Sequence, residues 1–299
     1  MDRFHLLTVF VAVAEEQSFA AAARKLGLSP PAVTRAVATL EERLAVKLLS
    51  RTTRFVRATD AGRRYLEDAR RILAELDQAD EAAGGVDAEP RGHLTVTAPV
   101  QFGRLFVLPV IGEYLRRYRS VQVSAMFLDR VVNLLEEGVD VGVRIGELPD
   151  SSLQAIHVAN VRRVLCASPD YLRERGQPKT PADLAGHDII SALGTNPVTE
   201  WKFGEGRKQQ TQRIAPRLMV TANDSGIDAA LSGFGITRLP SYQIESYLAA
   251  GRLQIVLSEF EPAKVPIHVL HREGRYTSPK VRTFLDLIVA ELRNNTSLP

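Results

Sequence analysis

The spacing of apolar and polar positions divides the chain into a helical first part and a mixed second part. In the first part, one apolar stripe recurs every three or four residues, as on one helix face, and comprises Val33, Val37, Leu40 and Leu44. We expect this helix to begin after Ser29 as its cap, with Pro30 at its first position, where a missing N–H costs nothing. A shorter alanine-rich helix is expected before it, capped by Ser18 and ended by Gly27. Two short helices that meet at a tight turn predict a helix-turn-helix.

The face of the second helix opposite its apolar stripe is small, polar or cationic. This face carries Pro31, Thr34, Arg35 and Ala38. A helix whose exposed N-terminal half is slim and positive can enter the major groove of DNA. Residues 50–54 are expected to form the tip of a short basic hairpin, the wing, with Phe55 and Val56 returning to the core.

A longer helix is expected to follow the wing, beginning at Asp60 with Thr59 as its cap. Its apolar positions form a heptad-like seam and comprise Leu66, Ala69, Leu73 and Leu76. Two alternatives are open for this seam, because it can pair with a second copy of the chain or pack against its own domain. We favour the first alternative, which predicts a dimer. Residues 82–91 contain the helix-breaking Gly and Pro of a hinge.

From His93 onwards, short apolar runs alternate with amphipathic stretches, which is the pattern of a sheet covered by helices. Strands are expected at LTVTAP, VQVSAMFL, VDVGVRIG, LQAIHV, RRVLCAS, DIISAL, RLMVT, FGITRLP and VPIHVLHRE. Helices are expected after the first strand and at RVVNLLEEG (capped by Asp129), SPDYLRERG, TPADLAG, NDSGIDAALSG, SYQIESYLAAG and SPKVRTFLDLIVAELR. The predicted fold class is therefore α/β, as two small lobes in residues 91–299, with an all-α, winged N-terminal part.

Charge strengthens the prediction of a DNA-binding element. Between Arg24 and Arg64 there are ten basic residues and three acidic ones, whereas the net charge of the whole chain is only +3. Each lysine or arginine placed on a phosphate releases a condensed counterion, so such a cluster favours binding to nucleic acid. The alternative, a merely solvated basic surface, requires the caps, the stripe and the hairpin to coincide by chance.

The composition is that of an ordinary globular protein, with 45% hydrophobic and 24% charged residues over 299 positions. The sequence has no apolar run of about 18 residues, the length of a membrane span, and its N-terminus lacks the features of a signal peptide. The single cysteine, Cys166, excludes an internal disulfide and lies in an apolar run, so a buried structural thiol is expected. These features predict a cytoplasmic protein that does not associate with a membrane.

Five segments carry a specific resemblance to a known family. They are SFAAAARKLGLSPPAVTRAVATLEERLAVKLLSRTTRFVRATDAG, GHLTVTAP, LLEEGVDVGVRIG, ASPDYL and SPKVRTFLDLI. Through them the chain resembles the LysR-type transcriptional regulators over essentially its full length. The resemblance implies a winged helix-turn-helix at 1–59, a dimerising linker helix and hinge at 60–90, and an effector-binding domain of the periplasmic-binding-protein architecture at 91–299. In that domain, the first lobe would span about 91–161 plus 266–299 and the second about 162–265.

The resemblance also implies which residues face DNA. They are Ser18, Ser29, Pro31, Thr34, Arg35, Arg51 and Arg54. Arg35 would contact either a guanine edge or a phosphate. Ser18 would contact either a phosphate or only solvent. The wing arginines Arg51 and Arg54 would approach either the DNA backbone or the minor groove. The chain departs from the family pattern at Pro30, where a polar residue is frequent, and at Ala45, where glycine is common. The first change removes a base contact, and the second concerns turn geometry.

Ligands in open α/β sheets bind in the crevice at the carboxyl ends of the strands. Loops at these ends give the candidate effector-binding residues Val100, Gln101, Phe102, Arg144, Ile145, Asn196, Trp201 and Asn223. A helix that begins near Gln101 would direct free N–H groups into the crevice, so the working hypothesis is a small anionic or aromatic effector. Two alternatives stay open: Arg144 can form a surface ion pair, and Trp201, the only tryptophan, can belong to the core.

Other function classes are disfavoured by the residues. The chain contains no Gly-x-Gly-x-x-Gly, P-loop, Gly-x-Ser-x-Gly or His-Glu-x-x-His motif, so no catalytic residue or cofactor is expected. His268 and His271 would face opposite sides of a strand, so no metal site is expected. We therefore predict a DNA-binding regulator controlled by a small effector, dimeric and further assembled into a tetramer, with RNA polymerase as a candidate partner. The alternative is a constitutive repressor or architectural protein without a ligand response.

Overall fold

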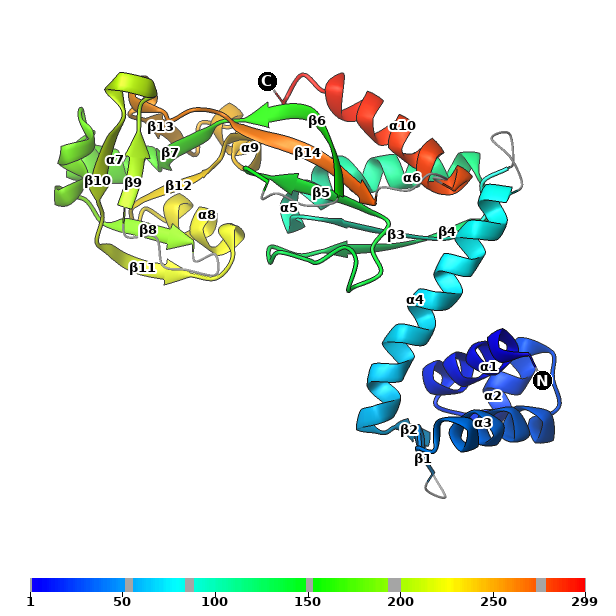
Figure 1. Cartoon of the computed structure of the whole chain (residues 1–299). Coiled ribbons are helices and arrows are strands. Elements are labelled where there is room, and N and C mark those ends of the chain that lie inside the picture. The colour runs from blue at the N-terminus through cyan, green and yellow to red at the C-terminus, as the bar shows by residue number, and fades with distance from the viewer. Residues whose placement is uncertain are drawn as a thin grey trace. The chain divides into compact units, whose positions relative to one another are not determined.

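The computed structural model describes residues 2–51, 56–83, 89–148, 153–192, 200–272 and 278–298, with only the backbone at 51, 74, 75, 77–83, 192 and 208. Contacts divide the chain into two units, the first up to residue 88 and the second from residue 89 onwards, with Ser278 grouped with the first (Figure 1). Among the described residues, no helix combines the length and the apolar character that a membrane span requires.

Helices α1 (Arg3–Glu16), α2 (Phe19–Leu26) and α3 (Pro30–Leu44) surround a small core in the first unit. The predicted ends of α2 are confirmed, because the Ser18 hydroxyl accepts the Ala21 N–H at 3.2 Å and Gly27 adopts a φ of +65°. The apolar stripe of α3 is buried as predicted, with Leu44 partly so.

The wing strands β1 (Leu49–Arg51) and β2 (Val56–Ala58) pair antiparallel, and α4 (Asp60–Ala83) follows them (Figure 1). Thr59 caps α4 as predicted, because its Oγ1 accepts the Gly62 N–H at 2.9 Å. The first three seam residues of α4, which are Leu66, Ala69 and Leu73, pack against the core of this same unit. Arg70 also pairs with Glu15 of α1 at 3.0 Å. Ala69 is fully buried in this core, whereas Leu66 and Leu73 are only partly buried, so the seam packs on its own unit without being fully covered by it. The dimer stays a prediction.

The second unit begins with a five-stranded sheet, which we call the first lobe. Its strand order is β4 (Val121–Phe127), β3 (Gly92–Ala98), β5 (Val141–Ile145), β14 (Val265–Arg272) and β6 (Leu153–Val161). β3 is parallel to β4 and β5, whereas β14 is antiparallel to both of its neighbours. Helices α6 (Leu108–Arg117) and α10 (Pro279–Arg293) pack against each other and on this sheet, and the Tyr114 hydroxyl of α6 donates to the Lys280 carbonyl at 2.7 Å.

A second five-stranded sheet forms what we call the second lobe. Its strand order is β11 (Pro216–Val220), β8 (Ile189–Ala192), β12 (Ile236–Pro240), β7 (Arg163–Ala167) and β13 (Gln254–Val256). One core, on the side of α7 (Pro169–Arg175), includes residues of the hairpin β9 (Glu200–Phe203) and β10 (Gln210–Arg213). The other core lies on the side of α8 (Asn223–Leu231) and α9 (Glu245–Ala249). Cys166 lies fully buried in β7, where burial raises the pKa of its thiol to about 12.

The chain passes between the two lobes twice. The first passage joins β6 to β7 at Arg162, and the second leads from β13 to β14. Nε and Nη2 of Arg162 donate to the two carboxylate oxygens of Glu261 at 2.8 and 2.6 Å, so one ion pair joins both passages.

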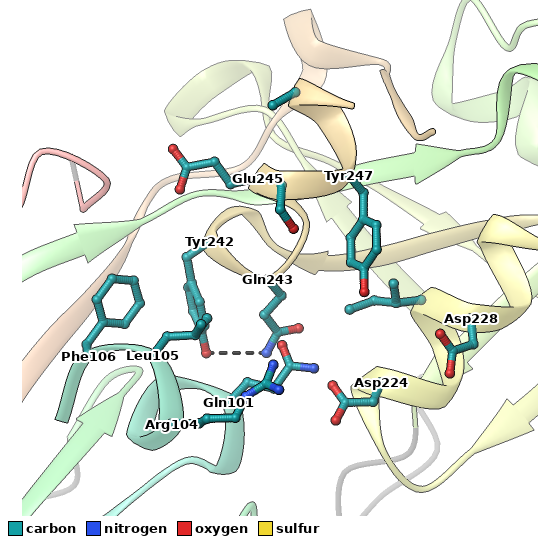
Figure 2. A pocket seen from close by; sticks show the side chains of 13 residues that line it. Gln101, Arg104, Leu105, Phe106, Asp224, Asp228, Tyr242, Gln243, Glu245 and Tyr247 are labelled. Atoms are coloured by element: carbon teal, nitrogen blue, oxygen red, sulfur yellow. Dashed lines mark hydrogen bonds between the residues drawn. The ribbon is translucent and has the colours of Figure 1, made fainter. Parts of the chain in front are cut away.

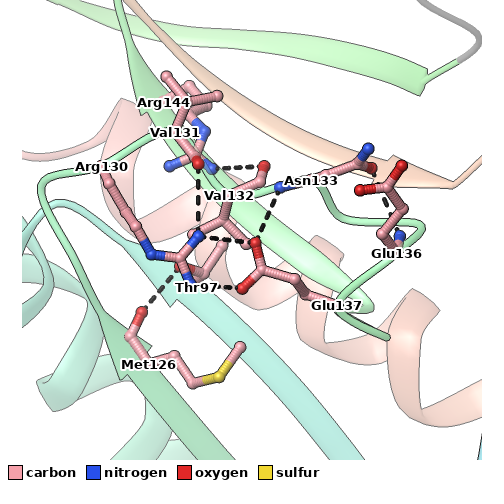
Figure 3. A network of polar contacts seen from close by, with 9 residues as sticks. All are labelled: Thr97, Met126, Arg130, Val131, Val132, Asn133, Glu136, Glu137 and Arg144. Carbon is pink, nitrogen blue, oxygen red and sulfur yellow. Dashed lines mark hydrogen bonds and ion pairs between the residues drawn. The ribbon is translucent and has the colours of Figure 1, made fainter. Parts of the chain in front are cut away.

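The helix predicted after Asp129 is wrong, because the segment between β4 and β5 adopts bends and turns. Asp129 instead accepts the Val100 N–H through Oδ1 at 3.0 Å, at the start of the short helix α5 (Val100–Phe102) that follows β3. Arg130 holds the two carboxylate oxygens of Glu137 at 2.8 and 2.6 Å, and the same carboxylate accepts the Asn133 N–H at 3.2 Å (Figure 3). This network closes a turn in place of a helix.

Some smaller elements also differ from the prediction. The helix expected at TPADLAG is a 3-10 turn over Pro181–Gly186, and SYQIESYLAAG forms a 3-10 turn over Ser241–Gln243 followed by the short α9. Strands β9, β10 and β13 were not predicted.

Candidate functional site

The exposed face of α3 holds four of the residues proposed to contact DNA. Ser29, Pro31 and Arg35 are exposed and Thr34 is half-buried, on the side opposite the buried stripe. Within the described part of the chain, Arg35 forms no hydrogen bond or ion pair. Its guanidinium is therefore available to a phosphate or a base edge.

The Ser29 hydroxyl does not cap α3, which contradicts the sequence expectation for this side chain. Pro30 and Pro31 occupy the first two helical positions and have no N–H groups, and the Ala32 N–H bonds the Ser29 carbonyl oxygen at 3.0 Å. Because the local donors are absent or engaged, the hydroxyl is left for another partner.

The remaining DNA candidates lie at the edges of this surface. The Ser18 hydroxyl already accepts a bond at the start of α2, but it keeps its own hydrogen to donate. Arg51 ends β1 with a side chain outside the described atoms, and Arg54 lies outside the described residues. Of the basic residues near Ser18, Arg24 is exposed, whereas Lys25 pairs with Glu16 at 2.9 Å.

Glu41 is a buried carboxylate that the sequence analysis did not single out. It is 5% exposed and accepts the Leu48 and Leu49 N–H groups at 2.9 and 3.0 Å and Lys47 Nζ at 2.7 Å. Burial pushes the pKa of Glu41 up, but the bonds from Lys47 and the two backbone N–H groups outweigh it and hold the pKa below its usual range. Glu41 thereby fixes the start of the wing against α3. The sequence signal that could have identified Glu41 is its position directly after Leu40, next to the buried stripe of the helix.

A cavity of about 590 Å³ lies between the two lobes of the second unit, and we call it the interlobe cavity (Figure 2). The first lobe contributes the short helix α5 (Val100–Phe102) and the π-helical turn Gly103–Val107, while the second lobe contributes α8 and residues 242–249. Its charged lining residues are Arg104, Asp224, Asp228 and Glu245.

Two nearly buried glutamines line this cavity. Gln101 is 7% exposed and Gln243 is 9% exposed. The Gln243 amide donates through Nε2 to the Tyr242 hydroxyl at 3.3 Å, and both side chains are visible at the cavity in Figure 2. Oε1 of Gln243 is buried without a hydrogen-bond partner. Buried polar atoms are normally bonded, so this oxygen is suited to accept a bond from a ligand.

The predicted effector residues are only partly gathered at this cavity. Gln101 lines it, and Asn223 begins α8, whose next residue Asp224 lines it. Phe102 is fully buried against the Phe106 and Tyr242 rings, at centroid distances of 4.8 and 5.5 Å. Val100, Arg144, Ile145 and Trp201 are not among the cavity's lining residues, and Asn196 lies outside the described residues.

Arg144 lies near the end of β5 and is half-buried. It donates through Nη2 to the Val132 carbonyl at 2.9 Å (Figure 3). Burial lowers the pKa of the Arg144 guanidinium. The positive charge of Arg130 lowers this pKa further, whereas the negative charge of Glu137 raises it. The described contacts of Arg144 are therefore structural, and they include no ion pair.

A second, smaller cavity of about 290 Å³ lies within the second lobe, and we call it the arginine pocket. It is lined by Arg163, Ile190, Ser191, Glu200, Trp201, Lys202 and Arg238. Trp201 is 4% exposed and belongs to the core beside α7. Of the two alternatives for Trp201, ligand contact and core packing, the structure therefore favours core packing. The sequence analysis missed Arg163 and Arg238, because they lie far apart in the chain and meet only when β7 pairs with β12.

No group of three or more His, Cys, Asp or Glu side chains is placed to hold a metal ion in the part of the chain that the structure describes.

Comparison with known proteins assigns both units. Residues 4–63 match the family described as bacterial regulatory helix-turn-helix protein, lysR family, and residues 87–293 match the LysR substrate binding domain. The regulator CrgA of Neisseria meningitidis is 33% identical over 290 residues, which cover 97% of each chain. The transcriptional activator TtdR of Escherichia coli is 30% identical over 295 residues, which cover 98% of this chain and 94% of TtdR.

Solved structures give the same assignment. CrgA aligns with a TM-score of 0.63 at 32% identity, covering 97% of this chain and 99% of CrgA. The virulence activator AphB of Vibrio cholerae aligns with a TM-score of 0.64 at 25% identity, covering 97% of this chain and 99% of AphB. The chain therefore belongs to the LysR-type family of DNA-binding transcriptional regulators, in which a helix-turn-helix is joined to a two-lobed effector-binding domain.

Proposed function

We propose that this regulator reads its operator with the exposed face of α3 and that a small effector bound between the lobes controls that binding. The observation that carries the DNA-binding part is the unpartnered polar and cationic face formed by Ser29, Pro31, Thr34 and Arg35. Arg51, Arg54 and Ser18 complete the proposed interface, the first two at the wing and the third on a neighbouring phosphate.

Arg35→Ala tests the role of α3. Fluorescence anisotropy with the promoter fragment and with random duplex should show a loss of about 1–3 kcal/mol on the specific fragment only, if Arg35 reads a base. Equal loss on both duplexes would assign Arg35 to a phosphate. The control Arg119→Ala removes the same charge from an exposed position in the second unit and should leave both affinities unchanged. Unchanged binding by Arg35→Ala would contradict the proposed reading face.

For the effector, Gln101 and Asn223 carry the proposal, because α5 and α8 approach the interlobe cavity from opposite lobes. Val100, Arg144, Ile145 and Asn196 stay proposed as further contributors, whereas Phe102 and Trp201 lie in the hydrophobic cores of the two lobes. An effector must bind one arrangement of the lobes more tightly than another in order to change DNA affinity.

We further propose that the protein works as a homodimer and assembles into a tetramer, since two helix-turn-helix domains can bind successive turns of a duplex. It acts in the cytoplasm, where its DNA target lies, and influences RNA polymerase without catalysing a reaction itself. The proposed boundaries are residues 1–59 for the DNA-binding domain, 60–90 for the linker and 91–299 for the effector domain.

A further inference from the structure

We propose that the arginine pocket binds a small oxygen-bearing anion, a carboxylate or an inorganic phosphate or sulfate, between Arg163 and Arg238. Arg163 opens β7 and Arg238 lies on the neighbouring antiparallel strand β12. Arg238 pairs with Leu165 and Arg163 with Pro240, so the two arginines are diagonal neighbours on one face of the sheet. Both line the same pocket.

Among the residues that the structure describes, these two cations have no counterion. Neither arginine forms an ion pair or a hydrogen bond with its side chain in the described part of the chain, and Nε of Arg238 is buried without a partner. Glu200 lines the pocket but forms no ion pair with either arginine. The undescribed segment 193–199, LGTNPVT, contains no acidic residue. Arg238 is half-buried with a fully buried Nε, whereas Arg163 is exposed at the strand end. A partly buried charge is unfavourable unless it is paired, so an anion from solution is the partner that Arg238 lacks.

The electrostatics of the pocket agree with a missing anion. Burial, with a contribution from the charge of Arg163, lowers the pKa of the Arg238 guanidinium to about 10. Part of the Arg163 side chain is exposed, yet burial of its guanidinium lowers its pKa as well. Both groups remain charged at neutral pH, and Lys202 adds a third basic residue to the lining. An anion between the arginines would reduce their mutual repulsion and offset the cost of their desolvation.

Aromatic rings hold Arg238 in place. Its Cζ lies 5.8 Å from the centroid of the Trp201 ring and 5.9 Å from that of Phe203. Stacking of this kind orients the planar guanidinium fork, which matches the oxygens of a carboxylate or phosphate. The volume of about 290 Å³ lies at the lower end of ligand pockets and suits a small anion. The pocket shares no lining residue with the interlobe cavity.

The binding site rests on the geometry of the second lobe alone, and only its effect on DNA binding rests on the proposed function. The test uses the full chain in isothermal titration calorimetry and thermal unfolding. The probes are phosphate, sulfate, succinate and benzoate, each compared with chloride at equal ionic strength. The variants are Arg238→Gln and Arg163→Gln, with Arg213→Gln as the control, because Arg213 is an exposed arginine on β10 of the same lobe.

At least one probe should give saturable heat and a saturable rise in Tm with the wild type and with Arg213→Gln. Its affinity should fall at least tenfold in both pocket variants. A response to phosphate and sulfate alone identifies an inorganic ligand, and a response to succinate or benzoate identifies an organic acid. If Arg238→Gln does not fold, Arg163→Gln, at the partly exposed strand end, carries the test.

The same response in all four proteins, or no response to any probe, would overturn the site. Promoter binding measured with and without the active probe separates the two proposals. Anion binding without any change in promoter affinity would leave the site in place and remove its regulatory role. If the wild-type protein binds the anion but does not recognise the promoter, the proposed function is overturned and the anion site stands.

Discussion

Arg35, Arg238 and Gln243 share one property: each has a polar atom that no other described residue bonds. Leaving a buried donor or acceptor without a partner costs about 1–3 kcal/mol, so such atoms are rare in a folded protein. Glu41 is the opposite case, because its carboxylate accepts three hydrogen bonds. The unpaired atoms of Arg238 and Gln243 lie at the two cavities, and the exposed Arg35 lies on the face proposed to contact DNA. The fully paired buried carboxylate of Glu41 supports the fold instead.

Glu41→Ala should loosen the junction of α3 and the wing. The substitution leaves the buried Leu48 and Leu49 N–H groups without acceptors, for a loss of about 2 kcal/mol. Hydrogen exchange at these amides, followed by mass spectrometry, should accelerate roughly thirtyfold, which is the factor equivalent to that free energy. The neighbour Glu42→Ala is exposed and should leave the rates within about twofold. Unchanged exchange in Glu41→Ala would show that the carboxylate does not anchor the wing.

The depressed pKa of Glu41 also predicts a pH dependence. Because the folded pKa lies below the ordinary value, the carboxylate contributes stability at pH values above about 4.5, and this contribution disappears as the pH falls through the folded pKa. The difference in exchange between wild type and Glu41→Ala should therefore be full at pH 7 and shrink below pH 4. A difference that stays constant down to pH 3 would contradict this assignment.

Ala45→Gly should stabilise the end of α3. Ala45 caps this helix with a φ of +52°, a left-handed conformation that is unfavourable for any residue with a Cβ. Glycine removes this strain, and we expect a gain of about 0.5–1 kcal/mol, measured as slower hydrogen exchange in α3. Ala38→Gly, at an exposed position in the middle of the same helix, should lose about 1 kcal/mol. Faster exchange in Ala45→Gly would refute the strain.

At the scale of elements, periodic segments and apolar runs were predictable, whereas the short strands β9, β10 and β13, which lack a clear apolar run, were not. The stripe of α3 and the apolar runs of β3, β4 and β14 are long enough to reveal their period. β10, with the sequence QTQR, has no apolar residue and becomes a strand only through its pairing with β9. The turn after Asp129 has helical spacing, but the bonds of Asp129 and of the Arg130–Glu137 pair favour another structure.

The candidate sites follow the same rule. The exposed face of α3 was predictable because residues within one helix share a face according to the helical period. The arginine pocket was not, since its two arginines become neighbours only through strand pairing. Gln243 was missed for the same reason: its approach to Gln101 depends on how the two lobes meet.

Gly62→Ala should displace α4 from the wing. A Cβ at this position would lie 1.9 Å from the Leu48 carbonyl oxygen, and backbone cannot yield as a flexible side chain does. We expect faster exchange at the β1–β2 amides, equivalent to at least about 2 kcal/mol, together with weaker promoter binding. The control Gly112→Ala adds its methyl to open space in α6 and should be neutral or stabilising. Wild-type exchange in Gly62→Ala would show that this close approach is not required.

Across the second unit, the ion pair of Arg162 and Glu261 connects the two passages between the lobes. Residues that join lobes in this way control hinge motion, because any change of the lobe angle passes through them. The Glu261 bond raises the pKa of the Arg162 guanidinium, so the pair is intact across the neutral pH range.

Glu261→Gln should make the hinge more mobile. Without its charge the side chain holds Arg162 less tightly, and a partly exposed pair of this kind contributes about 1 kcal/mol. Hydrogen exchange at the β6–β7 junction should increase by roughly fivefold, while the centres of both sheets stay unchanged. Glu259→Gln, an exposed neighbour, is the matched control. Exchange at the junction that equals that of the control would mean that the ion pair does not restrain the lobes.

The position of Cys166 has a practical consequence for following such motions. Its sulfur is fully buried and protonated at neutral pH, so alkylating reagents should not modify the native protein. Cys166 is also the sole thiol of the chain, and a cysteine introduced elsewhere would therefore be the only site to take a fluorophore or spin label. Any slow background labelling of Cys166 would therefore report how often strand β7 of the second lobe separates from its neighbours β12 and β13.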